Sequence, residues 1–394
     1  MISNKMKQSI EKSSAIRAMF EEGIRLSKIY GKENVYDFSL GNPSVFPPKS
    51  VKNALISLLE NEDPNFLHGY TPNAGYSDVR EFIAKKFAEE FGINASSDGV
   101  VLTNGAAAAL NIILKTLLNP DDEVIIFAPF FGEYLSYVNN YDGVPVIIPV
   151  DEKSFSPDMS ELEKKLSPKT KAVIVNNPNN PSGAVYPEET LKKISEILAA
   201  AEKKYGHPIY IISDEPYRKL VYTGKKVAFI GNYYKNTFFA YSFSKTLSLP
   251  GERIGYLVLP DAADDFCDIT SSLCTANRIS GFVNAPTLFQ RLLLTCFNEA
   301  VDISIYDKNR KAMYNKLIEL GFECILPEGA FYMFPKALIP DDKAFCEAAK
   351  EFRLLIVPGS AFGCPGYFRL AYCVDYKTII NSFDSFTKLA EKFK

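Results

Sequence analysis

The middle of the chain alternates short apolar segments with longer stretches of helical character. Pro187–Tyr205 predicts a helix because its leucine and isoleucine residues recur at helical spacing. Gly105–Leu118, which opens with an alanine run, and Phe131–Tyr141 are interpreted as helices as well. Uninterrupted apolar strands separated by helices are typical of a mostly parallel sheet covered on both faces. The pattern therefore predicts an α/β fold with a seven-stranded, mostly parallel sheet, whose strands we expect at Val100–Thr103, Glu123–Ala128, Val144–Val150, Lys171–Asn176, Ile209–Ser213, Thr237–Tyr241 and Ile254–Leu259.

The two ends of the chain follow a different pattern. Ser13–Tyr30 predicts an amphipathic helix, and Ser39–Pro48 an extended segment rich in Gly and Pro. After residue 295 we expect a long helix to about Leu320, a final helix, and between them strands near Phe331–Phe334, Leu355–Val357 and Phe368–Cys373. This α+β pattern predicts a smaller domain formed by both termini, residues 1–45 and 295–394, beside a large domain of residues 46–294.

Charge and composition exclude several classes of function. The net charge is only −3, from 44 basic and 47 acidic residues, and no block of like charges favours nucleic acid or an anionic membrane as partner. No apolar run approaches the roughly 20 residues of a membrane helix, and the polar N-terminus lacks the apolar core of a signal peptide. Seven irregularly spaced cysteines suit a reduced compartment, and His68 and His207 have no metal-ligand spacing. We therefore expect a cytoplasmic protein without a metal.

Polar residues follow several of the predicted strands. These residues stand at the end of a predicted strand or in the turn that follows it: Asn104, Asn180, Asp214 and the segment Ser242–Lys245. Ligands of open α/β sheets bind at the carboxyl ends of the strands. The sequence therefore predicts a binding site formed by these residues.

The segment Ser242-Phe-Ser-Lys245, with Arg253 eight positions later, has the groups needed to hold a phosphorylated aldehyde. The lysine would form an imine with the aldehyde, and the hydroxyls and the guanidinium would bind the phosphate. A polar turn with two solvated cations explains the same residues equally well. The segment alone does not decide between them.

The pattern S-x-S-K-x7-R-x-G resembles the lysine signature of the class I and II aminotransferases, which are pyridoxal-5′-phosphate (PLP) enzymes of fold type I. Five further segments resemble motifs of this aspartate aminotransferase-like family, in compatible order, and the resemblance spans nearly the whole chain. They are Leu40-Gly41-Asn-Pro43, Tyr70-Thr-Pro-Asn-Ala-Gly75, Asn180-Pro-Ser-Gly183, Asp214-Glu-Pro-Tyr217 and Phe368-Arg-Leu370.

The resemblance implies a role for each matching residue toward PLP. Lys245 would be the Schiff-base lysine, and its freed amine the base that moves a proton from the substrate's Cα. Asp214 would pair with the pyridine nitrogen and keep it protonated. Tyr217 and Asn180 would bind the phenolic oxygen, with a cis bond after Asn180. The remaining cofactor contacts implied are the phosphate ligands Arg253, Ser242, Ser244 and the backbone amides of Gly105 and Ala106, and the ring-stacking residue Phe131.

The resemblance also implies how the substrate is bound. Arg369 would hold its α-carboxylate with two parallel donors, and Gly41 and Asn180 would lie beside it. Tyr70 would reach the phosphate of a neighbouring subunit, so we expect a homodimer with shared active sites. Arg278 is similar to an arginine that the partner donates for a second carboxylate, although its spacing from Asn284-Ala-Pro286 is one residue longer than expected; a solvated loop arginine explains it as well.

The expected function is amino-group transfer from an L-amino acid, with aspartate or another acidic amino acid as best guess, to a 2-oxo acid such as 2-oxoglutarate. A C–S (beta) lyase or a decarboxylase of the same fold is the alternative, since Lys245 and Asp214 serve those reactions too. A PLP-binding transcription regulator would need a DNA-binding domain, for which the segment before Gly41 is too short. A catalytically silent binding protein is disfavoured by the intact set of Lys245, Asp214 and Arg369.

Overall fold

The computed structural model describes residues 2–11 and 15–394. A seven-stranded sheet with the order β2-β8-β7-β6-β5-β3-β4 forms its centre, which confirms the predicted α/β fold. β8 runs antiparallel to both of its neighbours, and the other pairs are parallel. The strands are β2 (Val100–Thr103), β3 (Glu123–Phe127), β4 (Val144–Ile148), β5 (Thr170–Asn176), β6 (Tyr210–Asp214), β7 (Thr237–Ser242) and β8 (Gly255–Val258).

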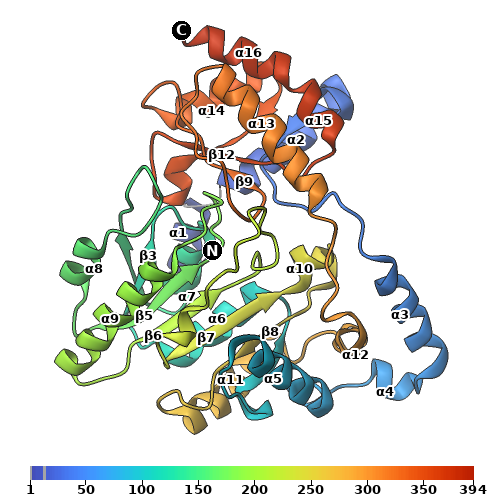
Figure 1. Cartoon of the computed structure of the whole chain (residues 1–394), viewed down its shortest axis with the longest axis vertical. Coiled ribbons are helices and arrows are strands. Elements are labelled where there is room, and N and C mark those ends of the chain that lie inside the picture. Colours follow the sequence, from blue (N-terminus) through green and yellow to red (C-terminus); the bar gives the residue numbers. More distant parts are fainter. Residues whose placement is uncertain (1, 12–14) are drawn as a thin grey trace.

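Both faces of this sheet are covered by helices (Figure 1). Successive residues of β3 show why its sequence is continuously apolar. Val124 and Ile126 pack in a core with α6, whereas Ile125 and Phe127 pack on the other face with α8 and α9. The helices of this part are α3 (Lys49–Asn61), α4 (Pro64–His68), α5 (Ser77–Phe91), α6 (Ala106–Leu117), α7 (Glu133–Asn140), α8 (Met159–Lys165), α9 (Glu188–Tyr205), α10 (Phe243–Thr246), α11 (Phe266–Ile279) and α12 (Thr287–Cys296).

The two ends of the chain pack together. β1 (Tyr36–Asp37) pairs in parallel with β10 (Leu354–Leu355), and β11 (Val357–Pro358), β12 (Phe368–Ala371) and β9 (Tyr332–Met333) form a three-stranded sheet. In Figure 1, the blue α2 lies beside the orange and red C-terminal helices. The helices of this terminal part are α1 (Asn4–Glu11), α2 (Ala15–Tyr30), α13 (Ser304–Glu319), α14 (Asp342–Glu351), α15 (Tyr376–Asn381) and α16 (Phe383–Lys392). Short 3-10 helices occur in both parts of the described chain: η1 (Lys32–Asn34), η2 (Ser97–Gly99), η3 (Ile230–Asn232), η4 (Pro250–Glu252) and η5 (Gly359–Phe362).

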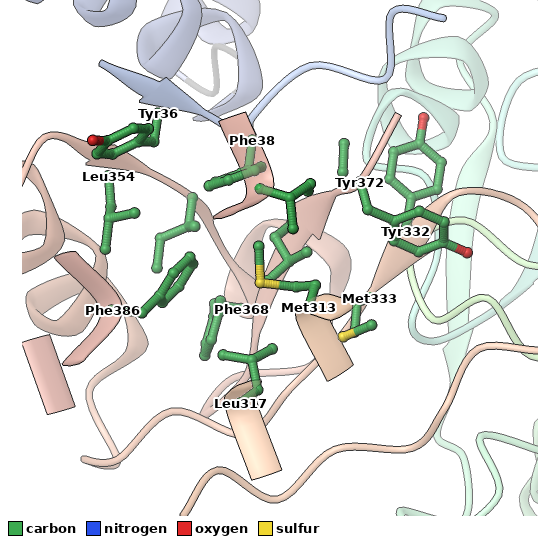
Figure 2. Packing of buried hydrophobic residues seen from close by; sticks show 14 of the residues in the cluster. Tyr36, Phe38, Met313, Leu317, Tyr332, Met333, Leu354, Phe368, Tyr372 and Phe386 are labelled. Atoms are coloured by element: carbon green, nitrogen blue, oxygen red, sulfur yellow. The ribbon is translucent and has the colours of Figure 1, made fainter. Parts of the chain in front are cut away.

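An apolar core joins these terminal segments. Phe38, from the N-terminal part, packs against Phe386 of α16 with 5.9 Å between ring centroids, and Phe368 of β12 lies in the same cluster (Figure 2). The N-terminal segment is therefore tied to the last helices of the chain. The boundaries at residues 45/46 and 294/295 stay predictions.

The C-terminal part differs from the sequence prediction in several details. The helix expected after residue 295 begins only at Ser304, α14 was not predicted, and the single final helix expected is two helices, α15 and α16. The strand expected at Leu355–Val357 is two strands, because the chain crosses at Ile356 from the sheet of β1 to the sheet of β12. The helix expected from Ser13 is described from Ala15, and residues 13 and 14 lie outside the described part. Within the described residues, no helix is both long and apolar enough to span a bilayer.

Candidate active site

A cavity of about 290 Å³ lies at the carboxyl ends of the central parallel strands. Most of the predicted site residues meet here, although they come from distant parts of the chain. Those that line it are Gly41, Ala106, Phe131, Asn180, Asp214, Tyr217, Ser242, Ser244, Lys245, Arg253 and Arg369.

Lys245 lies in α10, directly after β7. Its Nζ donates a hydrogen bond to the Gly41 carbonyl oxygen at 2.8 Å. Burial lowers the pKa of the Lys245 amine to about 8; Cys373 opposes this, and the positive charges of Arg253 and Arg369 add to it. The neutral amine, the form that can act as a nucleophile or base, is thus accessible near neutral pH.

Asp214 is the last residue of β6 and is buried. Its Oδ2 accepts a hydrogen bond from the Tyr134 hydroxyl at 2.5 Å, whereas its Oδ1 is buried and has no hydrogen-bond partner among the described residues. Burial raises the pKa of the Asp214 carboxyl to about 7; the Tyr134 bond opposes this shift and Glu215 adds to it. The free oxygen is ready to accept from a cationic N–H group.

Asn180 and Tyr217 line the same cavity as this carboxyl. The Asn180 amide donates to Asn176 Oδ1 at 2.7 Å, and Asn176 Nδ2 donates to the Asp214 carbonyl at 2.8 Å. The Asn180–Pro181 bond is cis, as expected. The Tyr217 hydroxyl lies 3.0 Å from the Tyr332 hydroxyl.

One end of the cavity has the groups of an anion site. The hydroxyls of Ser242 and Ser244 lie 2.7 Å apart, and Arg253 donates through Nη2 to the Asn104 carbonyl at 3.0 Å. Gly105 has a φ of +85° and caps the N-terminus of α6, whose first N–H groups have no partner within the helix. A Cβ at Gly105 would lie 2.9 Å from Arg253 Nη2, so a side chain here would crowd the guanidinium as well as strain the positive φ.

The opposite end contains a buried guanidinium. Arg369 on β12 is 2% exposed and donates to Asn180 Oδ1 at 3.2 Å and to the Ser39 carbonyl. Its Nε has no partner, and the described residues include no carboxylate in ion-pair range of it. The rings of Tyr332 and Phe362 lie 4.7 and 4.8 Å from its guanidinium carbon. Burial lowers the pKa of Arg369, and a desolvated cation of this kind favours an incoming anion.

Gly41 passes close to this guanidinium end. A Cβ at Gly41 would lie 1.9 Å from the Tyr332 hydroxyl oxygen, so no other residue fits at this position. The segment that carries Gly41 therefore approaches the cavity with its backbone alone.

Gly105 lies next to Arg253 at the edge of the cavity without lining it, and two further predicted site residues, Tyr70 and Arg278, lie outside the cavity of their own chain. Tyr70 is 94% exposed, and Arg278 lies exposed in the last turn of α11. Neither contributes to the cavity lining. Their predicted roles require a second subunit.

Sequence reasoning missed Tyr134 and Tyr332. Tyr134 holds the Asp214 carboxylate, and Tyr332 contacts Tyr217 and flanks Arg369. Tyr134 follows Phe131 by three residues, a spacing that also fits an ordinary buried helix face. The chain has 22 tyrosines, and only the fold distinguishes these two.

The sequence and the fold are similar to those of known proteins. The family model of "Aminotransferase class I and II" matches residues 33–383. A probable aspartate/prephenate aminotransferase from Aquifex aeolicus is 32% identical over 91% of this chain and 92% of its own. Aromatic-amino-acid aminotransferase 2 from Thermococcus litoralis is 32% identical over 92% and 94%.

Two crystal structures extend this similarity to the fold. An amino transferase from Eubacterium rectale superposes with a TM-score of 0.96 at 44% identity, covering 100% of both chains. The aspartate aminotransferase from Thermus thermophilus with maleate superposes with a TM-score of 0.88 at 26% identity, covering 99% of both.

Proposed function

The chain belongs to the class I and II aminotransferase family, and on that premise we propose that it transfers the amino group of aspartate or another acidic L-amino acid to a 2-oxo acid, such as 2-oxoglutarate, with PLP as cofactor. The aminotransferase activity itself follows from the named relatives, all of which cover most of the chain. These names do not favour the lyase or decarboxylase alternative.

One observation carries the proposal. A buried guanidinium without a carboxylate partner in the described chain, Arg369, shares a cavity with Lys245, whose pKa is lowered to about 8. A carboxylate bound by Arg369 and an amine near Lys245 are the two groups that every α-amino acid carries. The cavity therefore suits the part of the substrate that all amino acids share.

The residues present fit PLP. The buried, unpaired Oδ1 of Asp214 suits a protonated ring nitrogen, and Phe131 lines the same cavity. Ser242, Ser244, Arg253 and the N-terminus of α6 would hold a phosphate, where Gly105 leaves the space open. Asn180 and Tyr217 would bind the phenolic oxygen. When bound, PLP supplies an aldehyde that condenses with amines and a ring that accepts electrons released at the substrate's Cα.

Residues of the cavity would then bind the substrate and move its proton. Arg369 binds the α-carboxylate through two donors and fixes its orientation, with Gly41 leaving room for the approach. The amine of Lys245, neutral above about pH 8, takes the proton from the substrate's Cα. The aromatic side chains of the lining exclude water from the reacting atoms.

The proposals of an acidic substrate and of a homodimer depend on two residues at the surface of the single chain. Tyr70 and Arg278 are exposed in the single chain, as expected of residues that complete a partner's site. Relatives named aspartate aminotransferases support an acidic substrate, for which Arg278 of the partner would bind the second carboxylate. We place the enzyme in the cytoplasm, which its odd and irregular cysteines support.

A half-reaction assay tests this function. The purified, PLP-loaded protein is mixed with aspartate, glutamate, phenylalanine or alanine without an acceptor, and the visible absorbance and the released 2-oxo acid are followed. Fast conversion by aspartate and glutamate, with formation of their 2-oxo acids, is the expected result. Cystathionine is assayed beside these substrates, and release of pyruvate together with ammonia and a thiol from it would instead identify a lyase.

The role of Arg278 is tested in the same assay. Arg278→Ala should slow aspartate and glutamate by about 10- to 100-fold, the loss expected for one charge-assisted contact, and leave alanine unchanged. Ile279→Ala, at the exposed neighbouring position, is the matched control. An equal loss for alanine would remove the proposed role of Arg278, and an equally selective loss for Ile279→Ala would show that the end of α11 rather than the Arg278 charge determines the effect.

A further inference from the structure

Tyr134 lies in the first turn of α7 and is 1% exposed. Its hydroxyl donates to Asp214 Oδ2 at 2.5 Å, and its ring stands edge-on to Phe131 at 5.6 Å between centroids. One side chain thus contacts both the carboxyl and the aromatic ring that face the cofactor position. The proposed function gives Tyr134 itself no role.

The hydrogen bond to Tyr134 determines which Asp214 oxygen remains available. An ionised carboxylate accepts at both oxygens. Oδ2 is taken by Tyr134, and Oδ1 is buried with no partner in the described chain. The carboxylate therefore cannot rotate freely, and it presents a single oxygen to the cavity.

We infer that Tyr134 is a positioning residue, which holds Asp214 ionised and oriented so that Oδ1 accepts the protonated ring nitrogen of PLP. The inference rests on the proposed function, because it assumes that PLP occupies the cavity. It adds to that function a residue, Tyr134, that influences the contact with the ring nitrogen only through Asp214.

The groups around Asp214 give the inference a pH signature. Tyr134 and Tyr137 face it from α7, and Glu215 and Tyr217 from the chain that follows β6. Burial raises the pKa of Asp214 to about 7, and the Tyr134 bond is the interaction that opposes this rise. Loss of the hydroxyl should therefore raise the pKa further, so that Asp214 is protonated, and PLP binding weakened, up to a higher pH.

Equilibrium binding of PLP to the cofactor-free protein, measured by absorbance across neutral pH, tests this. Tyr134→Phe keeps the ring and its contact with Phe131 and removes only the donor. We expect PLP to bind about 10- to 100-fold more weakly at neutral pH, the range for one hydrogen bond to a charged group. The midpoint of the pH dependence should move to higher pH.

Two controls separate this role from a structural one. Tyr141→Phe removes another hydroxyl at the end of the same helix, one that donates to Asn111 Oδ1 at 3.2 Å, and should bind PLP like the wild type. In an Asp214→Asn background, Tyr134→Phe should cause no further loss, because the two residues act as one unit.

Each remaining outcome decides the question. If Tyr134→Phe binds PLP with the wild-type affinity and pH dependence, or if its loss persists in the Asp214→Asn background, the inference is wrong and the proposed function stands. If the wild-type protein itself does not bind PLP, the proposed cofactor is wrong and the inference fails with it.

Discussion

The buried amine of Lys245 links the stability of the cofactor-free protein to pH. Its pKa is lowered from the ordinary 10.5 to about 8, so between these values the unfolded chain binds more protons at this site than the folded one. Stability at this site therefore rises with pH from about 8 to 10.5 and is constant below that range. Lys245→Met should abolish this rise.

Urea unfolding of the cofactor-free protein at a series of pH values measures the effect. As the pH increases from about 8 to 10.5, the free energy of unfolding of the wild type should rise relative to that of Lys245→Met. Lys225→Met, at an exposed lysine, should leave the wild-type slope unchanged. A parallel profile for the wild type and Lys245→Met would show that the amine is not desolvated.

At the scale of single residues, the sequence predicted the groups with distinctive chemistry. Lys245, Asp214 and Arg369 stand in short motifs and line one cavity. Tyr134 and Tyr332 could not be predicted, because a tyrosine at helical or strand spacing is ordinarily a packing residue. Their roles depend on which neighbours the fold supplies, and a single sequence does not contain that information.

The turn after β6 depends on a buried ion pair. Glu215 and Arg218 have side chains 1% and 7% exposed, and Arg218 donates to Glu215 at 3.1 Å and to Glu90 at 3.0 Å. Arg218 also donates to the Val227 carbonyl at 2.7 Å. This network holds the segment that follows Asp214 against α5 and the Val227 carbonyl.

Removing Arg218 should destabilise the fold strongly. Arg218→Met leaves Glu215 buried without its cation, and we expect a loss of about 3–5 kcal/mol in the free energy of unfolding. Lys192→Met, which breaks an exposed pair with Glu188, should cost less than about 1 kcal/mol. Denaturant unfolding with the two variants side by side measures both, and similar losses would contradict the structural role of the buried pair.

At the scale of elements, the central strands were predictable and the terminal ones less so. A strand covered on both faces, such as β3 or β5, needs an unbroken apolar run that stands out in the sequence. β10 and β11 contain two residues each and belong to different sheets. Their apolar run Leu354–Val357 is continuous, so the change of partner at Ile356 leaves no local signal.

For the whole molecule, the proposed homodimer makes a prediction about mixed subunits. Tyr70→Ala and Lys245→Ala should each have little activity alone. In a hybrid dimer, the subunit that keeps Lys245 receives an intact Tyr70 from its partner, so one of the two sites is complete. After unfolding and refolding an equal mixture, we expect about a quarter of the wild-type specific activity, since half of the dimers are hybrid.

The control is each variant refolded alone, which should stay inactive. Activity that does not return on mixing, although hybrid dimers form by mass measurement, would mean that Tyr70 serves its own chain. The fold of one chain was predictable from periodicity and motifs. The homodimer rests on the family resemblance of the Tyr70 motif alone, because an exposed residue such as Tyr70 carries no physical pattern that identifies what it touches.

The pairing of β1 with β10 has a consequence for biosynthesis. Tyr36–Asp37 and the much later Leu354–Leu355 lie side by side, and the cavity takes Gly41 from just after the first segment and Arg369 from just after the second. While the ribosome is still adding the segments after β8, the sheet with Lys245 and Asp214 can already have emerged, but Arg369, the arginine proposed to bind the carboxylate, does not yet exist. A nascent chain can therefore build the part of the cavity around Lys245 and Asp214 first, and on the proposed function it can hold a substrate only after Arg369 has been made and has folded against Gly41.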